Sequence, residues 1–413
     1  MAVIKDRRVV VTGRGCISAI GLSPEALFES LKQYKNAVCK IDDWDKFKGL
    51  HTKLAVPIFD FDTPSHYGRK EVRSMGRVAI LAVYASELAL NDAGLFASPE
   101  LQNGRCGVAY GSSSGSVNAI LEFHSMMTAH SVFDVTSATY LKMMPHTTAV
   151  NISVFFKLTG RLVPTGTACT SSSLAIGNAY ELIKQGKQDI MIAGGAEELS
   201  PTQSVVFDTL FATSTKNDTP ELTPAPYDQD RDGLVVGEGA GTLILEEYEH
   251  AKARGAKIYA EIVGFATNTD GTHITQPNKD TMAISIRDAI ADAGISPSEI
   301  GYVSGHGTAT TQGDIAETCA TYEAFSRAVP ISSLKSYIGH TLGACGAIEA
   351  VALIEMLNNN WYHPTLNLNQ VDPRCGELDY IQHVGREMQN TYVMSNNFAF
   401  GGINTSLIFR KCS

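Results

Sequence analysis

The chain has 413 residues, of which 44% are hydrophobic and 18% charged, and its formal net charge at pH 7 is −10. This composition excludes intrinsic disorder and supports a large buried core spread over two or three domain-sized units. The acidic balance argues against nucleic acid as the main partner, because phosphate binding needs a basic surface, but it leaves room for local basic patches that meet acidic partners.

The N-terminal sequence and the cysteines both favour a cytoplasmic protein. The start, "MAVIKDRRVVVTGRG", has no apolar run before a cleavage site and predicts a first strand rather than a signal peptide. No run of about 18 uncharged apolar residues occurs, so we expect no membrane-spanning segment. The eight cysteines form no CxxC pairs, which argues against a disulfide framework and against a zinc site.

Taken in chain order, the predicted elements alternate between strands and helices. Residues 7–13, "RRVVVTG", predict a strand, and "SPEALFESLKQ" predicts a helix capped by Ser23. Residues 104–116 predict a strand that runs into a small-residue loop. The apolar run of residues 188–198, "QDIMIAGGAEE", predicts a central strand buried on both faces and ended by its glycine pair. This alternation predicts an α/β fold with parallel sheets covered by helices.

Two pairs of segments indicate an internal duplication. "CGVAYGSSSGS" is similar to "IGYVSGHGTAT", and "RRVVVTGRGCIS" is similar to "AEIVGFATNTDG". A join near 250–260 predicts two halves, residues 1–252 and 253–413. Since no low-complexity linker lies between them, we expect the halves to pack tightly. The long polar loop at 207–241 contains three prolines, and loops of this length usually carry function or cover a site.

The segment "PTGTACTSSSLAIGNAYELIKQG" at residues 164–186 places Cys169 where a helix begins. The unpaired N–H groups and the dipole of a helix N-terminus favour a thiolate. A buried start of a helix rich in small residues explains the segment equally well.

Three further side chains occupy comparable loops. His306 follows a predicted strand end in "SGHGTAT", and His340 precedes an apolar helix in "KSYIGHTLGACG". Lys335 lies among small and apolar residues, which is compatible with a half-buried cation. Either Asp314 or Glu317 could provide a counter-charge for His306, and both are equally well explained as acids in the first turn of a helix.

Near the C-terminus, "NNFAFGGINTSLIF" places two glycines next to Phe400. Such a turn could supply a backbone N–H to an oxyanion, with the ring as a gate, or it could simply lead into the last strand. One thiol, two imidazoles and one lysine without a metal signature indicate covalent acyl chemistry. These residues alone leave acyl transfer, hydrolysis and condensation open.

At this level of detail the chain resembles a known family. "GTACTSSSLAI", "GHGTATTQGDIAE", "KSYIGHTLGACGAIEA" and "NNFAFGGINTSLIF" are similar, in this order, to the signatures of β-ketoacyl-acyl carrier protein synthases of the II type. The resemblance extends over essentially the whole chain. It implies the thiolase fold, in which two similar halves form a five-layered αβαβα body, and it implies a dimer.

The resemblance also implies roles for individual residues. Cys169 would take the acyl chain from a carrier thioester, and neutral His306 and His340 would donate to the enolate oxygen formed when malonyl-carrier protein loses CO₂. The N–H groups of Cys169 and Phe400 would form the oxyanion hole. Further roles are implied for Lys335 beside the histidine with Glu317 as its partner and Asp314 in support, for Thr308 and Thr310 on the phosphopantetheine arm, and for Gly401 and Ser114 at the substrate.

The implied partner is an acidic acyl carrier protein loaded with acyl or malonyl groups. Arg69, Lys70 and Arg73 are predicted to dock it from an exposed helix start, and Lys216 from a second basic position; a solvated helix face is the alternative. No organic cofactor is implied, because 4′-phosphopantetheine arrives on the carrier, and no catalytic metal is predicted. Some relatives suggest a structural monovalent cation, for which Glu349, Ser395 and Asn396 are candidates.

Three positions depart from the family pattern. Ser114 stands where II-type members carry a bulky aliphatic residue, Ala399 where glycine is usual, and Gly305 where alanine is usual. These departures leave open a ketosynthase of a polyene or other type II polyketide-like pathway that works with a chain-length partner subunit.

Three other functions fit less well. A non-catalytic chain-length subunit would lack the nucleophile, whereas Cys169 is present. A thiolase would need a second catalytic cysteine near the C-terminal glycine motif, and "FAFGGIN" has none. A thioester hydrolase is not favoured by paired histidines with a lysine. Cys345, close to His340 in sequence, is predicted to be structural like the remaining cysteines.

Overall fold

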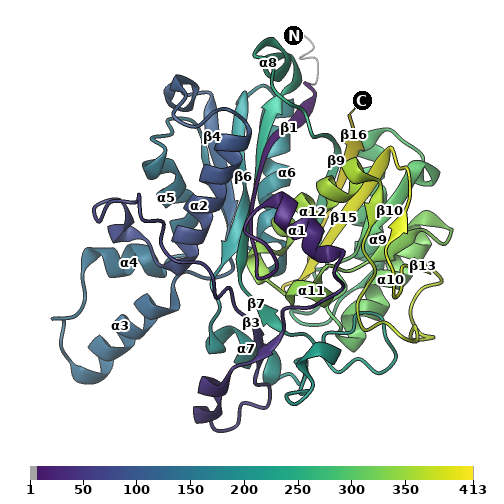
Figure 1. Cartoon of the computed structure of the whole chain (residues 1–413), viewed down its shortest axis with the longest axis horizontal. Coiled ribbons are helices and arrows are strands. Elements are labelled where there is room, and N and C mark those ends of the chain that lie inside the picture. The colour runs from purple at the N-terminus through teal and green to yellow at the C-terminus, as the bar shows by residue number, and fades with distance from the viewer. Residues whose placement is uncertain (1–6, 413) are drawn as a thin grey trace.

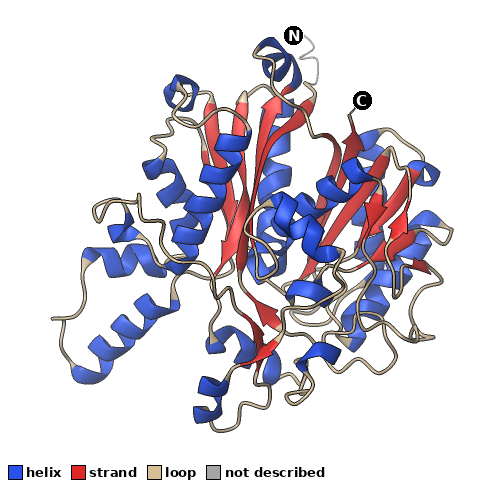
Figure 2. Cartoon of the chain, viewed as in Figure 1, coloured by secondary structure: helices blue, strands red, loops and turns tan. Residues whose placement is uncertain are grey.

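The structure, a computed structural model, describes residues 7–412. It is built around one mixed sheet whose faces are covered by helices (Figures 1 and 2). Residues 1–6, where the predicted N-terminal half begins, and residue 413 lie outside the described residues. Within the described part, the sheet has 11 strands in the order β13-β11-β10-β15-β16-β9-β1-β8-β6-β4-β5.

The order of the strands shows two similar halves. The first half contains β1 (Val9–Ile17), β8 (Gly239–Glu247), β6 (Ile190–Glu197), β4 (Cys106–Gly111) and β5 (Leu162–Thr165). The second contains β9 (Ala260–Thr269), β16 (Ile403–Lys411), β15 (Tyr392–Ala399), β10 (Ile300–Ser304), β11 (Pro330–Ser332) and β13 (Asp379–Tyr380). Counted outward from the β1–β9 junction, β1 matches β9 and β4 matches β10. These are the two strand pairs whose sequences predicted the duplication; the boundary at residue 252 stays a prediction.

The prediction of parallel sheets is confirmed only for the outer strands. The outer strands β4, β5 and β6, and likewise β10, β11 and β15, are parallel, but the central strands β8, β1, β9 and β16 run antiparallel to their neighbours. In the C-terminal half the reason is local: β15 and β16 are joined by a tight turn, and only an antiparallel pair can be joined in this way.

The glycine pair of β6 does not end the strand, contrary to the sequence prediction. The strand continues through Gly194 and Gly195 to Glu197, and all its residues are buried, as predicted. A side chain at Gly194 would lie 2.0 Å from the carbonyl oxygen of Gly241 on β8, and one at Gly195 would lie 2.5 Å from that of Gly343. The glycines therefore serve close backbone packing in the middle of the molecule.

Helices form three of the five layers (Figure 1). The outer layers are α2 (Arg77–Asp92) with α5 (Thr147–Phe155), and α9 (Lys279–Ala293) with α10 (Thr311–Phe325). Between the two halves of the sheet lie α6 (Ser171–Lys184) and α12 (Cys345–Asn359), which contact strands of both halves. The αβαβα arrangement that the family resemblance implied is therefore present.

The remaining elements are short or peripheral. The helices are α1 (Pro24–Leu31), α3 (Val117–Ala129), α4 (Ser137–Met143), α7 (Pro201–Asp208), α8 (Tyr248–Ala253) and α11 (Lys335–Ile338). The short strands are β2 (Cys39–Lys40), β3 (Leu54–Val56), β7 (Val236–Gly237), β12 (Trp361–Tyr362) and β14 (Arg386–Glu387). The predicted cap of α1 is confirmed, because the Ser23 side chain accepts a hydrogen bond from the Ala26 N–H.

The middle layer explains where the candidate site lies. Helix α12 is buried from Cys345 to Leu357, including the ion-paired Glu349 and Glu355, and Gly177 lets α6 approach the ring of Phe265 on β9. Each helix follows the edge region of its own half, α6 after β5 and α12 after β11. The pseudo-symmetry therefore brings together the two loops that precede these helices, which carry Cys169 and His340. Within residues 7–412, no helix combines the length and the apolar character needed to cross a membrane.

Candidate active site

Cys169 lies in a short 3₁₀ turn, Ala168–Thr170, that leads directly into α6. The side chain is buried, with 4% exposure, and Ala168 before it has a positive φ of 49°. The thiol is thus held at the N-terminus of a buried helix by a strained turn, and it faces the loops of the other half of the molecule.

His340 is in direct contact with this thiol. Its Nε2 atom lies 3.0 Å from Cys169 Sγ, and its Nδ1 atom accepts a hydrogen bond of 3.2 Å from the Leu342 N–H. Because a backbone N–H can only donate, the proton of the neutral imidazole must sit on Nε2. His340 therefore presents an N–H donor to the sulfur.

His306 has the same tautomer for a different reason. Its Nδ1 atom lies 3.1 Å from Lys335 Nζ and 3.4 Å from Asn397 Nδ2, and both neighbours are donors. The proton of the neutral ring is therefore on Nε2. The rings of His306 and His340 are perpendicular, with centroids 5.2 Å apart.

Both imidazoles are neutral at physiological pH. Burial, reinforced by the positive charge of Lys335, holds the pKa of His306 and that of His340 well below the usual value of 6.5. The site thus offers two uncharged N–H donors in a water-poor environment, which is the form that stabilises a developing negative charge on oxygen.

Lys335 is paired with Glu349, not with Glu317 as the sequence predicted. Its Nζ atom is 2.5 Å from Glu349 Oε1, and Glu349 Oε2 accepts a hydrogen bond of 2.7 Å from Asn397. Although burial opposes the charge, the Glu349 carboxylate more than compensates and raises the pKa of Lys335, which therefore stays an ammonium. Glu349 lies on α12, one turn after the first residue of that helix. It meets the lysine only because α12 packs beside it, so tertiary packing selects this partner.

Glu317 and Asp314 hold the backbone around His306 and do not contact its ring. Glu317 accepts hydrogen bonds from the N–H groups of His306, at 2.5 Å, and Gly307, at 2.7 Å. Burial raises the pKa of Glu317 to about 8. Asp314 accepts from the N–H groups of Thr308 and Ala309 and pairs with Arg231. Both acids belong to the first turns of α10, so neither is the imidazole's counter-charge.

Phe400 lies in the turn between β15 and β16, and its amide is directed at the Cys169 thiol. Burial raises the pKa of Cys169 to about 11, while the Lys335 charge and hydrogen bonds from the N–H groups of Phe400 and Cys169 act in the opposite direction. The Phe400 ring packs on Phe207, with centroids 5.2 Å apart. The segment is therefore a tight turn whose Phe400 N–H is directed at the thiol; an oxyanion donor and a gate formed by the ring stay predictions.

A pocket opens from these groups to the surface. Cys169, His306, His340 and Phe400 line it, together with the half-buried Thr308 and Thr310. The exposed side chains of Phe211 and Ile274 border it. The pocket thus has reactive groups at its base and hydroxyl groups along one wall.

Two predicted substrate residues do not line this pocket. Gly401 is exposed in the turn, where its N–H donates to the Ile274 carbonyl, and its neighbour Gly402 lines the pocket instead. Ser114 Oγ lies 3.3 Å from Glu197 Oε1 and 3.4 Å from Gln203 Nε2. Ser114 thus joins a buried polar cluster around Glu197.

The other two departures from the family pattern also have local explanations. A side chain at Gly305 would lie 2.2 Å from Tyr227 Oη, so the glycine makes room for a buried tyrosine. Ala399 ends β15 in an ordinary strand pairing with Ile403, which tolerates a Cβ atom.

The residues predicted to dock the carrier protein differ from the expectation in their secondary structure and in their exposure. Arg69, Lys70 and Arg73 are exposed, but they lie in turns and a 3₁₀ segment before α2 and not at a regular helix start. Lys216 is half-buried, with its Nζ atom 3.9 Å from Asp232.

The candidate cation ligands are only partly free. Glu349 is occupied by Lys335 and Asn397, whereas the polar side-chain atoms of Ser395 and Asn396 have no hydrogen-bond partner among residues 7–412. In that same range, Cys169, His306 and His340 are the one His/Cys/Asp/Glu group with metal-ligand spacing. Both imidazoles direct a protonated Nε2 into that group, so they are placed as donors rather than as ligands.

Sequence reasoning missed two residues of the site. Asn397 bridges His306 and Glu349, and its only sequence signal is the asparagine pair in "NNFAF". Arg231, buried beside the Thr308–Thr310 loop, lies in the long polar segment at 207–241 whose function the sequence left open.

Comparisons with known proteins agree with this geometry. The family model described as Beta-ketoacyl synthase, N-terminal domain, matches residues 6–251, and its C-terminal counterpart matches residues 259–369. The 3-oxoacyl-[acyl-carrier-protein] synthase 2 of Vibrio cholerae serotype O1 is 38% identical over 416 residues, covering 99% of this chain and 100% of the relative.

Solved structures extend the likeness. A crystal structure of a beta-ketoacyl synthase from Burkholderia phymatum matches with a TM-score of 0.97 and 59% identity, covering 98% of this chain and 100% of the other. A complex of a type II polyketide synthase acyl-carrier protein with its ketosynthase bound to the hexaketide matches with a TM-score of 0.88 and 31% identity, covering 99% and 100%.

Proposed function

The chain belongs to the β-ketoacyl synthase family and has its thiolase fold, and we propose that it is a 3-oxoacyl-[acyl-carrier-protein] synthase that elongates fatty acyl chains. One observation carries the proposal: the Cys169 thiol, the Nε2–H groups of His306 and His340, and the N–H groups of Cys169 and Phe400 converge in one buried pocket. This is an acyltransferase site, with a nucleophile, an oxyanion hole and two neutral donors.

In the first step, Cys169 Sγ attacks the carbonyl carbon of an acyl thioester on a carrier protein. The C–S bond to the carrier breaks, the carrier leaves as a free thiol, and the proton of Cys169 goes to that leaving sulfur. The N–H groups of Cys169 and Phe400 receive the oxyanion of the tetrahedral intermediate. The His340 Nε2–H group, 3.0 Å from the sulfur, supports the thiolate as it forms.

In the second step, malonyl-carrier protein loses CO₂, and the electron pair of the broken C–C bond moves into an enolate. Its oxygen accepts hydrogen bonds from His306 Nε2–H and His340 Nε2–H. The enolate carbon then attacks the acyl carbonyl, the bond to Cys169 Sγ breaks, and the β-ketoacyl-carrier product leaves. The returning thiolate takes one proton, so that the cycle closes. Removing one such donor typically raises the barrier by about 3–4 kcal/mol.

The proposed partner is an acyl carrier protein. The Vibrio cholerae relative is named for its action on such carriers, and the solved complex contains one. Exposed Arg69, Lys70 and Arg73 would meet its acidic surface, with half-buried Lys216 at a second point. We propose that the enzyme needs no organic cofactor beyond the phosphopantetheine of the carrier. We also propose a cytoplasmic location, as the sequence predicts. A monovalent cation at Ser395 and Asn396 remains part of the proposal.

We propose a homodimer as the functional unit. Within the described residues, β5 pairs with β4 on one side only, so it forms one edge of the large sheet. In the same half, helices α3 and α4 project from the body (Figure 1), and α3 buries only Ala119. Exposed apolar side chains lie along this region: Ile120, Leu121, Met127, Val132, Phe133, Tyr140 and Leu141.

A second candidate is condensation in a polyene or other type II polyketide-like pathway, with a related chain-length subunit in place of the second copy. The observation that favours it is the polar cluster of Ser114, Gln203 and Glu197, because the usual aliphatic residue at position 114 is missing. The solved ketosynthase bound to a hexaketide is a relative of this kind.

Intact-mass analysis of the wild type and Cys169→Ala tests the proposal. Each protein is incubated with acyl-carrier proteins of different chain length and unsaturation, and malonyl-carrier protein is added afterwards. We expect an acyl adduct on the wild type alone, released as a β-ketoacyl product two carbons longer. The acyl chain that loads most completely onto Cys169 distinguishes fatty acid elongation from condensation in a polyene or other polyketide-like pathway.

Cys345→Ala is the matched control, because the Cys345 thiol is buried and donates to the Cys169 carbonyl oxygen. It should still load and release the chain. An adduct that persists in Cys169→Ala would refute the assigned nucleophile, and absence of elongation by the wild type with every carrier would refute the condensing function.

A further inference from the structure

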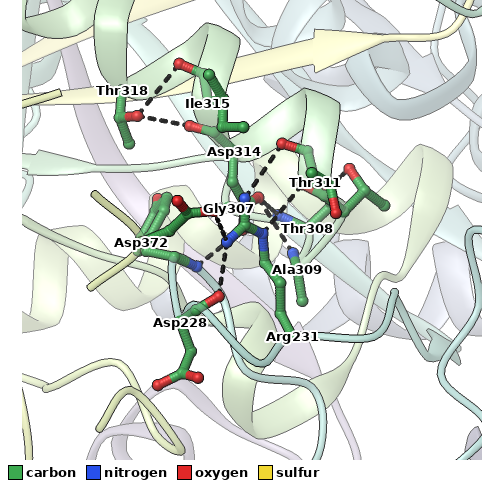
Figure 3. A network of polar contacts seen from close by, with 12 residues as sticks. Asp228, Arg231, Gly307, Thr308, Ala309, Thr311, Asp314, Ile315, Thr318 and Asp372 are labelled. Atoms are coloured by element: carbon green, nitrogen blue, oxygen red, sulfur yellow. Dashed lines mark hydrogen bonds and ion pairs between the residues drawn. The ribbon is translucent and has the colours of Figure 1, made fainter. Parts of the chain in front are cut away.

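Arg231 is a buried cation that the proposed reaction does not use. It lies in the loop between the 3₁₀ turn Pro220–Leu222 and β7, and 1% of its side chain is exposed. Its Nη1 atom is 2.8 Å from Asp372 Oδ2 and its Nε atom is 3.3 Å from Asp314 Oδ2, with both carboxylates buried (Figure 3). A charge removed from water in this way is retained at a substantial cost, which two carboxylates offset.

Arg231 also donates to backbone carbonyl groups, and its single Nε–H is shared between Asp314 and Thr310 O. Nη1 donates to Asp228 O at 2.6 Å, Nε to Thr310 O at 3.4 Å, and Nη2 to Thr311 O at 3.2 Å. The planar guanidinium thereby joins the loop of residues 228–231 to the segment that connects His306 with α10, and Asp372 adds a third segment. A lysine cannot make this set of contacts, because its ammonium group has no fork of donors.

The segment that Arg231 holds has little stability of its own. Ala309 has a φ of 65° and Gly307 a φ of 33°, and a left-handed residue with a side chain is unfavourable by about 1–2 kcal/mol. Asp314, fixed by Arg231, accepts from the N–H groups of Thr308, at 3.0 Å, and Ala309, at 3.2 Å. Arg231 and Asp314 therefore impose the conformation of this loop from both sides.

The loop presents two hydroxyl groups to the pocket. Thr308 Oγ1 and Thr310 Oγ1 are 2.9 Å apart, and both residues line the pocket above Cys169. His306, by contrast, is fixed separately by Lys335, Asn397 and Glu317. Loss of Arg231 would thus displace the threonines more than the imidazole.

We propose that Arg231 is a positioning residue for the carrier-bound substrate: it fixes the Thr308–Thr310 loop so that the two hydroxyls bind the phosphopantetheine arm. The inference rests on the proposed function, which supplies the arm. We therefore expect the phosphopantetheine arm to contribute to binding only when the Arg231 guanidinium is present. The reactivity of the Cys169 thiol should not depend on it.

The test compares two carrier proteins, one with the phosphopantetheine arm and one without it, on the full-length enzyme. We expect the wild type to bind the arm-bearing carrier more tightly. In Arg231→Gln the affinity for that carrier should fall about tenfold, the scale of one or two lost hydrogen bonds, while the affinity for the carrier without the arm stays the same. The KM for malonyl-carrier protein should rise by a similar factor, with kcat changed less than threefold.

Two further variants separate positioning from plain stability. Arg231→Lys keeps the charge and should recover part of the lost affinity; it also serves if Arg231→Gln does not fold. Arg14→Gln is the matched control, because Arg14 is likewise buried, with 5% exposure, between Asp92 and Glu355 away from the pocket. It should lower the melting temperature and leave both affinities as they are. Alkylation of Cys169 by iodoacetamide should proceed at the wild-type rate in all variants.

An unchanged preference for the arm in Arg231→Gln would overturn the inference, as would equal losses for both carriers or the same loss in Arg14→Gln. Absence of any preference in the wild type would overturn it as well. If the wild type prefers the arm in an Arg231-dependent manner but does not condense, the proposed function fails and the positioning role stands, because binding is measured without turnover.

Discussion

At the scale of single residues, the two histidines owe their chemistry to groups on the far side of each ring. The Leu342 N–H fixes the tautomer of His340, and Lys335 with Asn397 fixes that of His306. The ammonium group of Lys335 also opposes a second positive charge nearby. Burial, aided by this one cation, therefore lowers the pKa of both imidazoles and keeps them neutral, with both donors directed into the pocket.

Gly305 shows how a departure from the family pattern is explained by packing beneath the site. Tyr227 is fully buried, and its hydroxyl has no hydrogen-bond partner among the described residues. A Cβ atom at position 305 would be 2.2 Å from that hydroxyl oxygen and 3.0 Å from Ile331 Cδ1. The glycine therefore accommodates the tyrosine and has no contact with the substrate pocket.

We predict strong coupling between these two positions. Gly305→Ala should lower the free energy of unfolding by about 2 kcal/mol, since overpacking of this kind costs roughly 1–3 kcal/mol. Tyr227→Phe removes an unpaired buried hydroxyl and should be neutral or slightly stabilising. In the double variant the alanine should cost at least about 1 kcal/mol less, as measured by chemical denaturation in a double-mutant cycle.

Tyr337→Phe provides the control for this cycle, because Tyr337 is also fully buried with an unpaired hydroxyl but is not among the atoms nearest Gly305. Its effect should add to that of Gly305→Ala. Additive effects for Tyr227→Phe as well would show that the hydroxyl does not decide the residue at position 305.

The sequence could predict that Cys169, the two histidines and the lysine belong to one site, because each lies in a short segment with its own pattern. It could not predict the partner of Lys335. Glu317 and Glu349 are both acids on helices near the lysine, and only the packing of α12 against β15, which carries Asn397, selects Glu349. Ion pairs of this kind depend on contacts between elements, which a single sequence does not display.

At the scale of elements, strands too are predicted by local sequence patterns, whereas their packing against other elements is not. The apolar run of β6 predicts a buried strand correctly, but the glycine pair predicts a terminus that the structure does not have. The missing information was the closeness of the Gly241 and Gly343 carbonyl groups. Likewise, alternation of strands and helices predicted sheets covered by helices but not the antiparallel centre of the sheet, and only the family resemblance implied the five layers.

The C-terminal end of β6 carries a second buried acid that connects both halves of the site. Glu197 accepts from the N–H groups of Ser113, at 2.8 Å, and Gly343, at 3.1 Å, and its other oxygen meets the hydroxyls of Ser112 and Ser114. Burial raises the pKa of Glu197 to about 7, from a reference value of 4.5. Its charge also raises the pKa of Cys169.

This acid should make stability depend on pH. Between about pH 4.5 and 7 the folded protein keeps the proton that the unfolded chain releases, so this group's contribution to stability declines as pH rises. Glu197→Gln mimics the protonated form. It should match the wild type near pH 5 and exceed its free energy of unfolding near pH 8, by an amount on the order of 3 kcal/mol.

Denaturation curves at several pH values measure this difference, with exposed Glu377→Gln as a control that should follow the wild type throughout. Iodoacetamide alkylation of Cys169 gives a second measurement, since loss of the Glu197 charge should make the thiol more acidic and faster to react at a given pH. Parallel pH dependence of the wild type and Glu197→Gln would contradict the assignment.

At the scale of the whole molecule, the duplication supplies the architecture of the site. Each half contributes a buried helix to the middle layer, and the loop before each helix carries one partner of the Cys169–His340 contact. The two halves also share a continuous sheet through β1 and β9. Since the site lies between the halves, its geometry depends on the packing of the complete chain.

The outer edge of the first half raises the question of what covers it. Leu121 is 55% exposed and Phe133 is 94% exposed, and both belong to the segment of α3 and α4 that projects from the first half (Figure 1). An edge strand with unpaired backbone groups and an adjacent apolar surface are typical of an interface between chains. A second copy related by a two-fold axis would pair the two β5 edges and cover both projecting segments.

We therefore predict that the double variant Leu121→Asp, Phe133→Asp is monomeric at micromolar concentration, whereas the wild type is a dimer in light scattering coupled to size-exclusion chromatography. Each subunit would bring two aspartates to the symmetric interface. These like charges would repel those of the other subunit and lose their hydration. Val384→Asp is the control, because Val384 is 64% exposed in the C-terminal half, away from β5. A wild type that is monomeric, or a double variant that remains dimeric, would refute this surface as the dimer interface.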